Sequence, residues 1–297
     1  MDQTEPPTAP DYLTVKELAA LLRLKERKVY DLAAAGDVPC SRVTGKLLFP
    51  REDVQAWIDE GQSGGTAHKA NRPSVFLGSH DPLLEWALRQ SRCELATFFD
   101  GSMDGLVRLQ AGEGIAAGLH LCDKELETWN TPVVAEMFAG QNMVLIGFST
   151  RRRGFVIAPD RVGDIQTPSD LDGQRVAMRQ AGSGTAKIFT NVVTKAGIEA
   201  TRMDVTQIAR SELDAVQAVA QGAADVTFGL EPLARQFGLG FVPMIEERFD
   251  LLVDRKAWFD TPMQTLLAFC RSKAFAARAR IETGYDVTGL GEVRWNG

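Results

Sequence analysis

Residues 176–189 have the sequence VAMRQAGSGTAKIF, and this stretch decides the fold of the larger part of the chain. It begins with apolar residues typical of a buried strand, passes through a turn rich in glycine and serine, and enters a helix. Strands that hand over to helices in this way indicate an α/β domain. The start of a helix also offers free N–H groups and a positive dipole end, which favour a bound anion.

Two other stretches repeat the pattern. Residues 75–82, VFLGSHDP, precede one helix, and residues 98–105, FFDGSMDG, precede another. A single loop of this kind is weak support for a site, because polar helix starts occur throughout α/β proteins. Three together predict a cleft lined by small polar groups. The loop at 179–185 lacks the Gly-Lys-Ser/Thr ending of a phosphate-binding P-loop, so nucleotide hydrolysis is not expected.

Composition limits the class of protein. The chain has 297 residues, which suits two domains of unequal size. Hydrophobic residues make up 44% and charged residues 24%, so both domains should bury a core. No window approaches the roughly 18 apolar residues of a membrane span, and the first residues do not resemble a secretion signal. We therefore expect a cytoplasmic protein with no membrane partner.

A segment with the composition of a linker divides the chain into two domains. Residues 61–73 are rich in glycine and polar residues, and prolines punctuate the first eleven residues. The sequence thus predicts a small domain at 12–60, a linker at 61–73 and a large α/β domain at 74–297.

The small domain has the pattern of a helix-turn-helix. Thr14 and Glu17 form a predicted capping box at the start of one helix, and a second helix from about Glu26 to Ala35 ends at Gly36. Residues 38–43 and 46–49 flank a Thr-Gly turn and predict a hairpin, which would be a wing.

Charge points to DNA only in this domain. The whole chain has a net charge of −6, but Arg23 to Arg51 contains seven basic and three acidic residues, a net charge of +4. A solvated charged face is the alternative interpretation. The start of a recognition helix and a wing are the parts that meet the major groove and the phosphates. The candidate DNA-binding residues are Lys25, Arg27, Lys28, Tyr30, Arg42, Thr44 and Lys46.

The segments 13–19, 29–30, 36–39 and 49–54 resemble the excisionase-type winged helix-turn-helix family, which is related to the MerR reader. The resemblance covers about residues 12–60 and implies double-stranded DNA as a partner. One DNA-binding domain of this size covers few base pairs, so specific binding implies a homodimer or larger homo-oligomer.

The large domain has its own resemblance. It is carried by residues 78–84, 101–109, 115–121, 179–185 and 224–230. They are similar to the periplasmic-binding-protein-like domain attached to helix-turn-helix readers and to molybdopterin-biosynthesis proteins. That domain resembles the type II solute-binding fold, whose relatives include molybdate and tungstate binders.

The resemblance implies two α/β lobes that are joined by two crossing strands, with the ligand between them. We expect the crossings near Phe148 to Val156 and Val242 to Leu252. Lobe 1 would then contain about residues 74–148 and 250–297, and lobe 2 about 155–242. One departure bears on the ligand: Ala186-Lys187 follows Gly-Ser-Gly-Thr, where many relatives have arginine.

The candidate ligand contacts are hydroxyls at the three helix starts, followed by four residues that could assist them. They are Ser79, Ser102, Ser183 and Thr185, with His80, Asp81, His120 and Arg179 as second choices. Asp81, Asp104 and Glu231 could instead be helix-start residues outside the cleft. The run Arg151-Arg152-Arg153 is typical of a solvated turn, but at the cleft mouth it would attract anions.

No motif predicts catalysis. Ser79-His80-Asp81 contains the residue types of a hydrolase triad, but neighbours in sequence cannot form the relay. The four cysteines form no CxxC pair, and His80, His120 and Cys122 lack a fourth metal ligand, so neither a disulfide nor a metal site is expected.

These features predict a ligand-responsive transcription regulator that is not an enzyme, needs no cofactor and senses a small anion, with molybdate or tungstate first among the ligands. Two alternatives stay open. One is a sensor or carrier of a molybdopterin-type or other polar organic ligand. The other is an architectural DNA-binding protein without a ligand.

Overall fold

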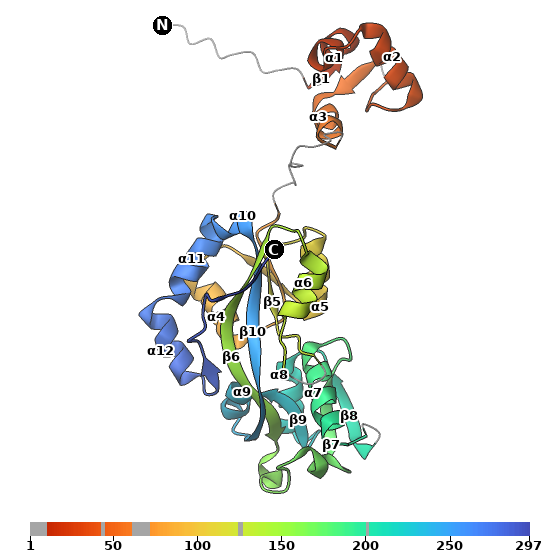
Figure 1. The fold of residues 1–297 in the computed structure, drawn as a ribbon. Coiled ribbons are helices and arrows are strands. Elements are labelled where there is room, and N and C mark those ends of the chain that lie inside the picture. The colour runs from red at the N-terminus through yellow and green to blue at the C-terminus, as the bar shows by residue number, and fades with distance from the viewer. Residues whose placement is uncertain (1–10, 43–44, 61–71, 124–126, 200–201) are drawn as a thin grey trace. The chain divides into compact units, whose positions relative to one another are not determined.

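The computed structural model of the chain describes residues 11–42, 45–60, 72–123, 127–199 and 202–297, drawn as ribbon in Figure 1. The chain divides into two compact units, Met1–Asn71 and Arg72–Gly297. Most of the predicted linker, residues 61–71, lies outside the described residues.

The N-terminal unit is a helix-turn-helix with a small sheet. Its elements are β1 (Tyr12–Thr14), α1 (Val15–Leu22), α2 (Glu26–Ala35), β2 (Leu48–Pro50) and α3 (Arg51–Glu60). The predicted capping box is present, since Glu17 N donates to the Thr14 hydroxyl and Thr14 N donates to the Glu17 carboxylate. Gly36 ends α2 with a φ of 77°, as expected for a glycine cap. Leu18, Val29, Phe49 and Val54 are fully buried in its core.

The predicted hairpin at 38–49 is confirmed in part. In the described residues it is reduced to one bridge, Ser41 with Leu48, and residues 43–44 of its turn are not described. The strand at Leu48–Pro50 also pairs with β1, which places Leu13 opposite Phe49 with both side chains buried. Burial of two large apolar side chains favours this pairing over a free-standing hairpin.

The capping box gives a test of this unit. Thr14→Ala removes the hydroxyl that accepts from Glu17 N. We expect the N-terminal unit to lose about 1 kcal/mol of unfolding free energy, which is typical for a lost N-cap. Urea unfolding followed by amide exchange in α1 measures this, and Thr14→Ser is the control because it keeps the cap. Equal stability of all three chains would contradict the prediction.

The C-terminal unit is built on one strongly curved sheet. Its strand order is β4-β3-β5-β10-β6-β9-β7-β8, and β11 and β12 also pair with β6. The strands are β3 (Val75–Gly78), β4 (Ala96–Phe99), β5 (Ala116–Leu119), β6 (Met143–Ile157), β7 (Arg175–Arg179), β8 (Asp204–Ala209), β9 (Val226–Leu230), β10 (Gly240–Asp254), β11 (Tyr285–Asp286) and β12 (Val293–Asn296).

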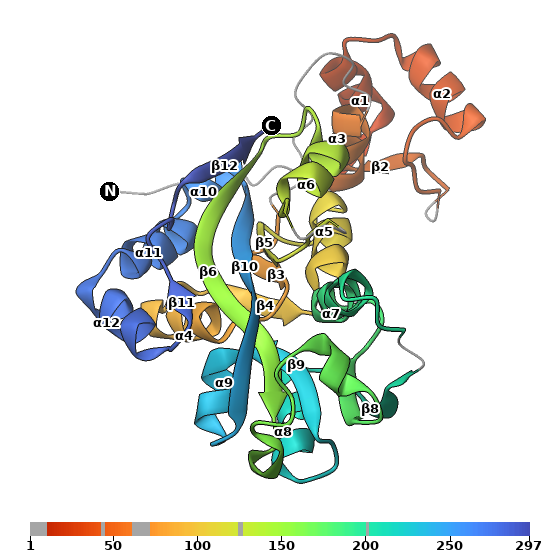
Figure 2. The ribbon, with the colours of Figure 1, turned by 60° about the horizontal axis from the view of Figure 1, so that its bottom comes forward.

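Two long strands join two lobes. β6 and β10 have 15 residues each and pair antiparallel along their length. At one end β10 pairs with β5, and at the other end β6 pairs with β9. Figures 1 and 2 show the two strands side by side, running from one lobe into the other. The expected crossings at Phe148–Val156 and Val242–Leu252 lie within them.

Helices cover the sheet in each lobe. The first lobe carries α4 (Pro82–Ser91), α5 (Ser102–Gln110), α6 (Thr131–Phe138), α10 (Arg255–Trp258), α11 (Thr261–Cys270) and α12 (Lys273–Ile281), and the second carries α7 (Gly184–Lys195), α8 (Glu212–Ala220) and α9 (Glu231–Gln236). Short 3-10 turns at Pro159–Arg161 and Pro168–Leu171 precede β7.

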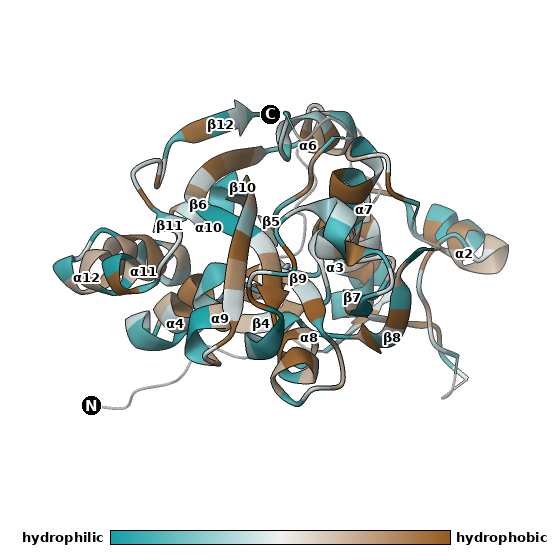
Figure 3. Cartoon of the chain, turned by 90° about the horizontal axis from the view of Figure 1, so that it is seen from below, coloured by the Kyte–Doolittle hydropathy of each residue, from teal (hydrophilic) through white to brown (hydrophobic). Residues whose placement is uncertain are grey.

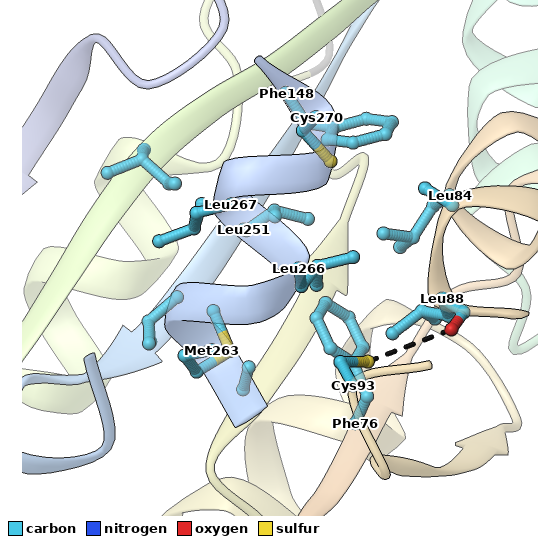
Figure 4. Close-up of a cluster of buried hydrophobic side chains, with 14 of the residues drawn as sticks. Phe76, Leu84, Leu88, Cys93, Phe148, Leu251, Met263, Leu266, Leu267 and Cys270 are labelled. Atoms are coloured by element: carbon cyan, nitrogen blue, oxygen red, sulfur yellow. Dashed lines mark hydrogen bonds between the residues drawn. The ribbon is translucent and has the colours of Figure 1, made fainter. Parts of the chain in front are cut away.

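Each lobe has its own apolar core. Figure 4 shows one cluster in the first lobe, where Met263, Leu266 and Leu267 of α11 pack toward Leu84 of α4 and Phe148 of β6. The second lobe is centred on a separate cluster of aromatic and aliphatic residues from β6, β9 and α7. In Figure 3 the long strands are mostly brown to white, whereas outer helices such as α9 and α12 carry teal stretches. The lobes are thus separate packed bodies on a shared pair of strands.

Candidate functional site

A cleft of about 320 Å³ lies between the two lobes of the C-terminal unit. The first lobe contributes the ends of β3, β4 and β5, and the second contributes the loops that open α7 and α8. The lining residues are Ser79, His80, Phe99, Asp100, Gly101, His120, Arg153, Arg179, Gln180, Ser183, Gly184, Thr185, Arg210, Ser211, Glu212 and Leu213. Residues of both lobes, between positions 79 and 213, therefore meet at one place.

Six of the eight predicted ligand contacts line this cleft. They are Ser79, His80, His120, Arg179, Ser183 and Thr185. Ser102 does not line the cleft but forms a hydrogen bond with Ser79, which does. Asp81 is buried elsewhere. The three glycine-marked loops therefore do converge, as their repeated pattern predicted.

Close backbone approach builds the first-lobe wall. A Cβ on Gly78 would lie 2.4 Å from the Gly118 carbonyl oxygen, and a Cβ on Gly105 would lie 2.3 Å from the Gly78 Cα. Only glycine allows β3, β5 and α5 to approach so closely. The Ser79 and Ser102 hydroxyls consequently lie 2.8 Å apart, and both side chains are almost fully buried.

The second-lobe wall has its own internal bonds. Ser183 caps α7 by accepting a hydrogen bond from Ala186 N at 3.1 Å, which leaves its hydroxyl proton available. Thr185 donates to Glu212 Oε1 at 3.2 Å. The Arg179 guanidinium donates to the backbone carbonyls of Ala209 and Arg210 from Nε and Nη2, so it fixes the loop before α8.

Asp81 is a correction. It caps α4 by accepting from Leu84 N, and its other oxygen accepts from Arg151 Nη1 at 2.7 Å and from the Tyr285 hydroxyl at 2.6 Å. With no exposed surface it cannot touch a ligand in the cleft. Of the two interpretations of this residue, the helix cap is the correct one.

Two other acidic residues also lie outside the cleft lining. Asp104 pairs with Arg108 on α5 at 2.8 Å. Glu231 is buried and pairs with Arg152 at 3.0 Å and with Arg235 at 3.2 Å. Neither carboxylate therefore repels a ligand in the cleft.

The run Arg151-Arg152-Arg153 is not a solvated turn. It lies inside β6, where alternate side chains point to opposite faces of the sheet. Arg151 and Arg153 are each 1% exposed, whereas the Arg152 side chain is 43% exposed. Arg153 reaches the cleft lining, so the second interpretation, arginine at the cleft, holds for that residue alone.

The two buried arginines share one carboxylate. Glu247 of β10 forms ion pairs with Arg151 and with Arg153, the latter at 2.9 Å from Nε to Oε2. Arg151 also pairs with Asp81 in the first lobe, and Arg153 pairs with Glu212 in the second. A chain of alternating charges thus passes from α4 to α8 through the two strands that join the lobes.

This network holds its members in fixed ionisation states. Burial alone would raise the pKa of Glu247, but Arg151 and Arg153 outweigh it and hold that pKa well below its usual range. Burial alone would also raise the pKa of Glu212, but Arg153 outweighs this effect and lowers that pKa to about 2. Burial lowers the pKa of His120, although Glu247 partly compensates. At neutral pH the carboxylates are therefore charged and His120 is neutral.

Neutralising Glu247 tests the network. Glu247→Gln leaves Arg151 and Arg153 buried with one fewer counter-charge, which should cost about 3 to 5 kcal/mol of unfolding free energy. Glu246→Gln is a matched control, because Glu246 is the exposed neighbour on the same strand. Denaturant unfolding of the two variants should separate them clearly. A similar loss for both would mean that Glu247 holds no special position.

Sequence reasoning missed the lining residues Phe99, Arg210 and Glu212, and it left the place of Arg153 open between a solvated turn and the cleft mouth. One feature of the sequence could have indicated Arg210 and Glu212. Ser211 and Asp214 form a capping box shortly after β8, in a strand-to-helix pattern like that of the other loops but without its glycine. Phe99 and Arg153 lie within strands, where no local pattern marks a residue as facing a ligand.

The N-terminal unit presents the predicted basic residues. Lys25, Arg27, Lys28 and Tyr30 are exposed on and just before α2. Tyr30, Arg42 and Lys46 line one groove between α2 and the loop before β2, and Lys16, which the sequence did not single out, joins them. Arg42 also donates to the Ala33 carbonyl at 2.9 Å, which ties the loop to α2. Thr44 lies outside the described residues.

A family model described as a PBP superfamily domain matches residues 85–271. The chain belongs to the PBP superfamily. A second model, described as a helix-turn-helix domain, matches residues 12–62. The PBP superfamily match covers both walls of the cleft except the first loop with Ser79 and His80, and the second match covers the described part of the N-terminal unit. No helix in the described part of the chain is long and apolar enough to cross a membrane.

The chain is also similar to individual known proteins. The chain is 24% identical over 302 residues to the uncharacterized protein YvgK of Bacillus subtilis (strain 168), covering 94% of this chain and 96% of the relative. A Clostridium perfringens protein solved with bound phosphate, described as a phosphate ABC transporter substrate-binding protein, has 13% identity and a TM-score of 0.52, covering 72% of this PBP superfamily chain and 99% of that one. A mutant of OxyR from Corynebacterium glutamicum has 14% identity and a TM-score of 0.48, covering 89% and 90%.

Proposed function

We propose that this protein is a ligand-responsive transcription regulator, in which the N-terminal unit binds double-stranded DNA and the interlobe cleft binds a small anion. One observation carries the proposal: a single chain joins a helix-turn-helix with exposed basic residues on and just before α2 to a PBP superfamily cleft. No catalytic step is part of the proposal, and the cleft takes a ligand rather than a cofactor.

The chemistry of the cleft supports an anion. α5 begins after Gly101 without a side-chain cap, so the N–H groups of its first turn stay open toward the cleft end of the helix. Arg179 and Arg210 add positive charge, and the Ser183 hydroxyl adds a donor. The lining carboxylate of Glu212 is already paired with Arg153, which reduces its repulsion of an anion.

Molybdate and tungstate are the first ligands we propose, because the sequence resembles domains whose relatives bind them. A second candidate is a larger organic anion, such as a molybdopterin-type compound. The volume of about 320 Å³ favours it, since that is the lower end of the range for sites that hold organic ligands. The ring of Phe99 in the lining also offers such a ligand an apolar surface.

Regulation would follow from closure of the lobes around the ligand in a homodimer that presents two DNA-binding units. Such hinge closure around ligands is a common switching motion. For this to work, the ligand must bind the DNA-binding state of the protein more or less tightly than the state that does not bind DNA. Such couplings are typically about 1 to 3 kcal/mol.

Ligand binding is tested by thermal shift of the full chain against molybdate, tungstate, sulfate, phosphate and a pterin compound. A ligand of the native state raises the apparent stability. Gly184→Ala should weaken binding at least tenfold, because its Cβ would lie 2.8 Å from His120 Cε1 and push the walls apart. Gly182→Ala is the control, since nothing lies within 4 Å of its Cβ position. No shift with any compound would favour an architectural protein without a ligand.

DNA binding is tested with Lys28→Ala, which removes an exposed cation from α2. If Lys28 contacts phosphate, binding should weaken similarly for all sequences and the salt dependence should fall by about one counterion. Arg89→Ala, an exposed arginine on α4 of the other unit, is the control. Operator affinity that does not change with saturating ligand would contradict the regulatory proposal while leaving DNA binding intact.

A further inference from the structure

His120 is held rigidly at the floor of the cleft. Its Nδ1 lies 3.2 Å from Glu247 Oε2, its ring stacks on Phe249 with centroids 6.1 Å apart, and its backbone N–H donates to the Ser102 hydroxyl. On the cleft side, a Cβ on Gly184 would lie 3.0 Å from Nε2. The imidazole is thus clamped on one side and faces the start of α7 with its other nitrogen.

The carboxylate of Glu247 decides which nitrogen carries the proton. A charged carboxylate only accepts hydrogen bonds, so Nδ1 must donate to it. In a neutral ring Nε2 is then an acceptor with a lone pair. Within the described part of the chain, no residue donates to Nε2. At this point the cleft therefore presents an uncharged acceptor, beside the serine and arginine donors of the lining.

An acceptor in this position conflicts with a fully deprotonated anion, whose oxygens are acceptors as well. We propose that the cleft binds its anion together with one proton, which is held between His120 Nε2 and an anion oxygen. The proton comes from solvent when the anion has none, and from the anion itself when it carries one. This inference rests on the proposed function, namely that the cleft binds an anion.

The charged neighbours of His120 allow this exchange. Glu247 of β10 favours a proton on the ring, whereas Arg151 and Arg153 of β6 oppose it. The residues that α5 and α7 bring to it, Ser102 and Gly184, carry no charge. An anion adds a second negative neighbour, which favours the imidazolium and raises the pKa of His120 in the complex.

The sign of the pH dependence follows. Burial lowers the pKa of His120 in the free protein, so the ring is neutral at neutral pH before binding. Binding then takes up a proton, and affinity should increase as the pH falls. Between the free and the bound pKa, the affinity for a deprotonated anion should change about tenfold per pH unit.

The experiment is calorimetric titration of the full chain with molybdate, sulfate and phosphate at pH 7.5, in two buffers of different ionisation enthalpy. We expect uptake of about one proton per molybdate or sulfate, and less for phosphate, which already carries a hydrogen. His120→Gln should abolish the uptake and flatten the pH dependence of affinity. Glu113→Gln, which changes an exposed titratable group outside the cleft lining, should retain both.

The outcomes separate the two proposals. Binding of molybdate or sulfate without proton uptake, or uptake that persists in His120→Gln, overturns this inference and leaves the proposed function standing. Absence of binding by all three anions removes the proposed anion ligand and this inference with it. If His120→Gln does not fold, the wild-type proton count and the ring signals of His120 in NMR spectra with and without molybdate decide.

Discussion

The burial of Glu247 between Arg151 and Arg153 is the constraint on which the C-terminal unit depends. A charge without exposed surface is tolerated only when it is paired, because its desolvation is expensive. Each arginine needs a second carboxylate, and the two partners lie in different lobes, Asp81 in the first and Glu212 in the second. β6 and β10, which join the lobes, therefore also carry the three charged residues that pair with one another and with a carboxylate of each lobe.

Much of the cleft could be predicted because its signals are local. A strand that ends in glycine and serine before a helix places a hydroxyl and free N–H groups at the sheet edge, whatever the rest of the chain does. Ser79 and Ser183 were found in this way, and the capping box at Thr14 likewise needs only a few residues of sequence. Local propensity and tertiary structure agree at these positions, as expected for a chain that folds to one state.

The network could not be predicted, since its pairs are far apart in sequence. Arg151 and Asp81 are 70 positions apart, and Tyr285 meets Asp81 across 204 positions. A run of three arginines is typical of a surface, and only the alternation of a 15-residue strand sends two of them inward. The pairing of β2 with β1 was missed for a related reason, because burial of Phe49 against β1 is a tertiary preference that the turn sequence does not contain.

The same network gives the cleft a physical link to the hinge. His120 and Arg153 both line the cleft, and both contact Oε2 of Glu247. A change of charge at either residue therefore alters the field on a carboxylate that also holds Arg151, and through it Asp81 at the start of α4. Under the proposed function, a ligand charge in the cleft would therefore act on a carboxylate whose two arginine partners pair with residues of both lobes, Asp81 in the first and Glu212 in the second.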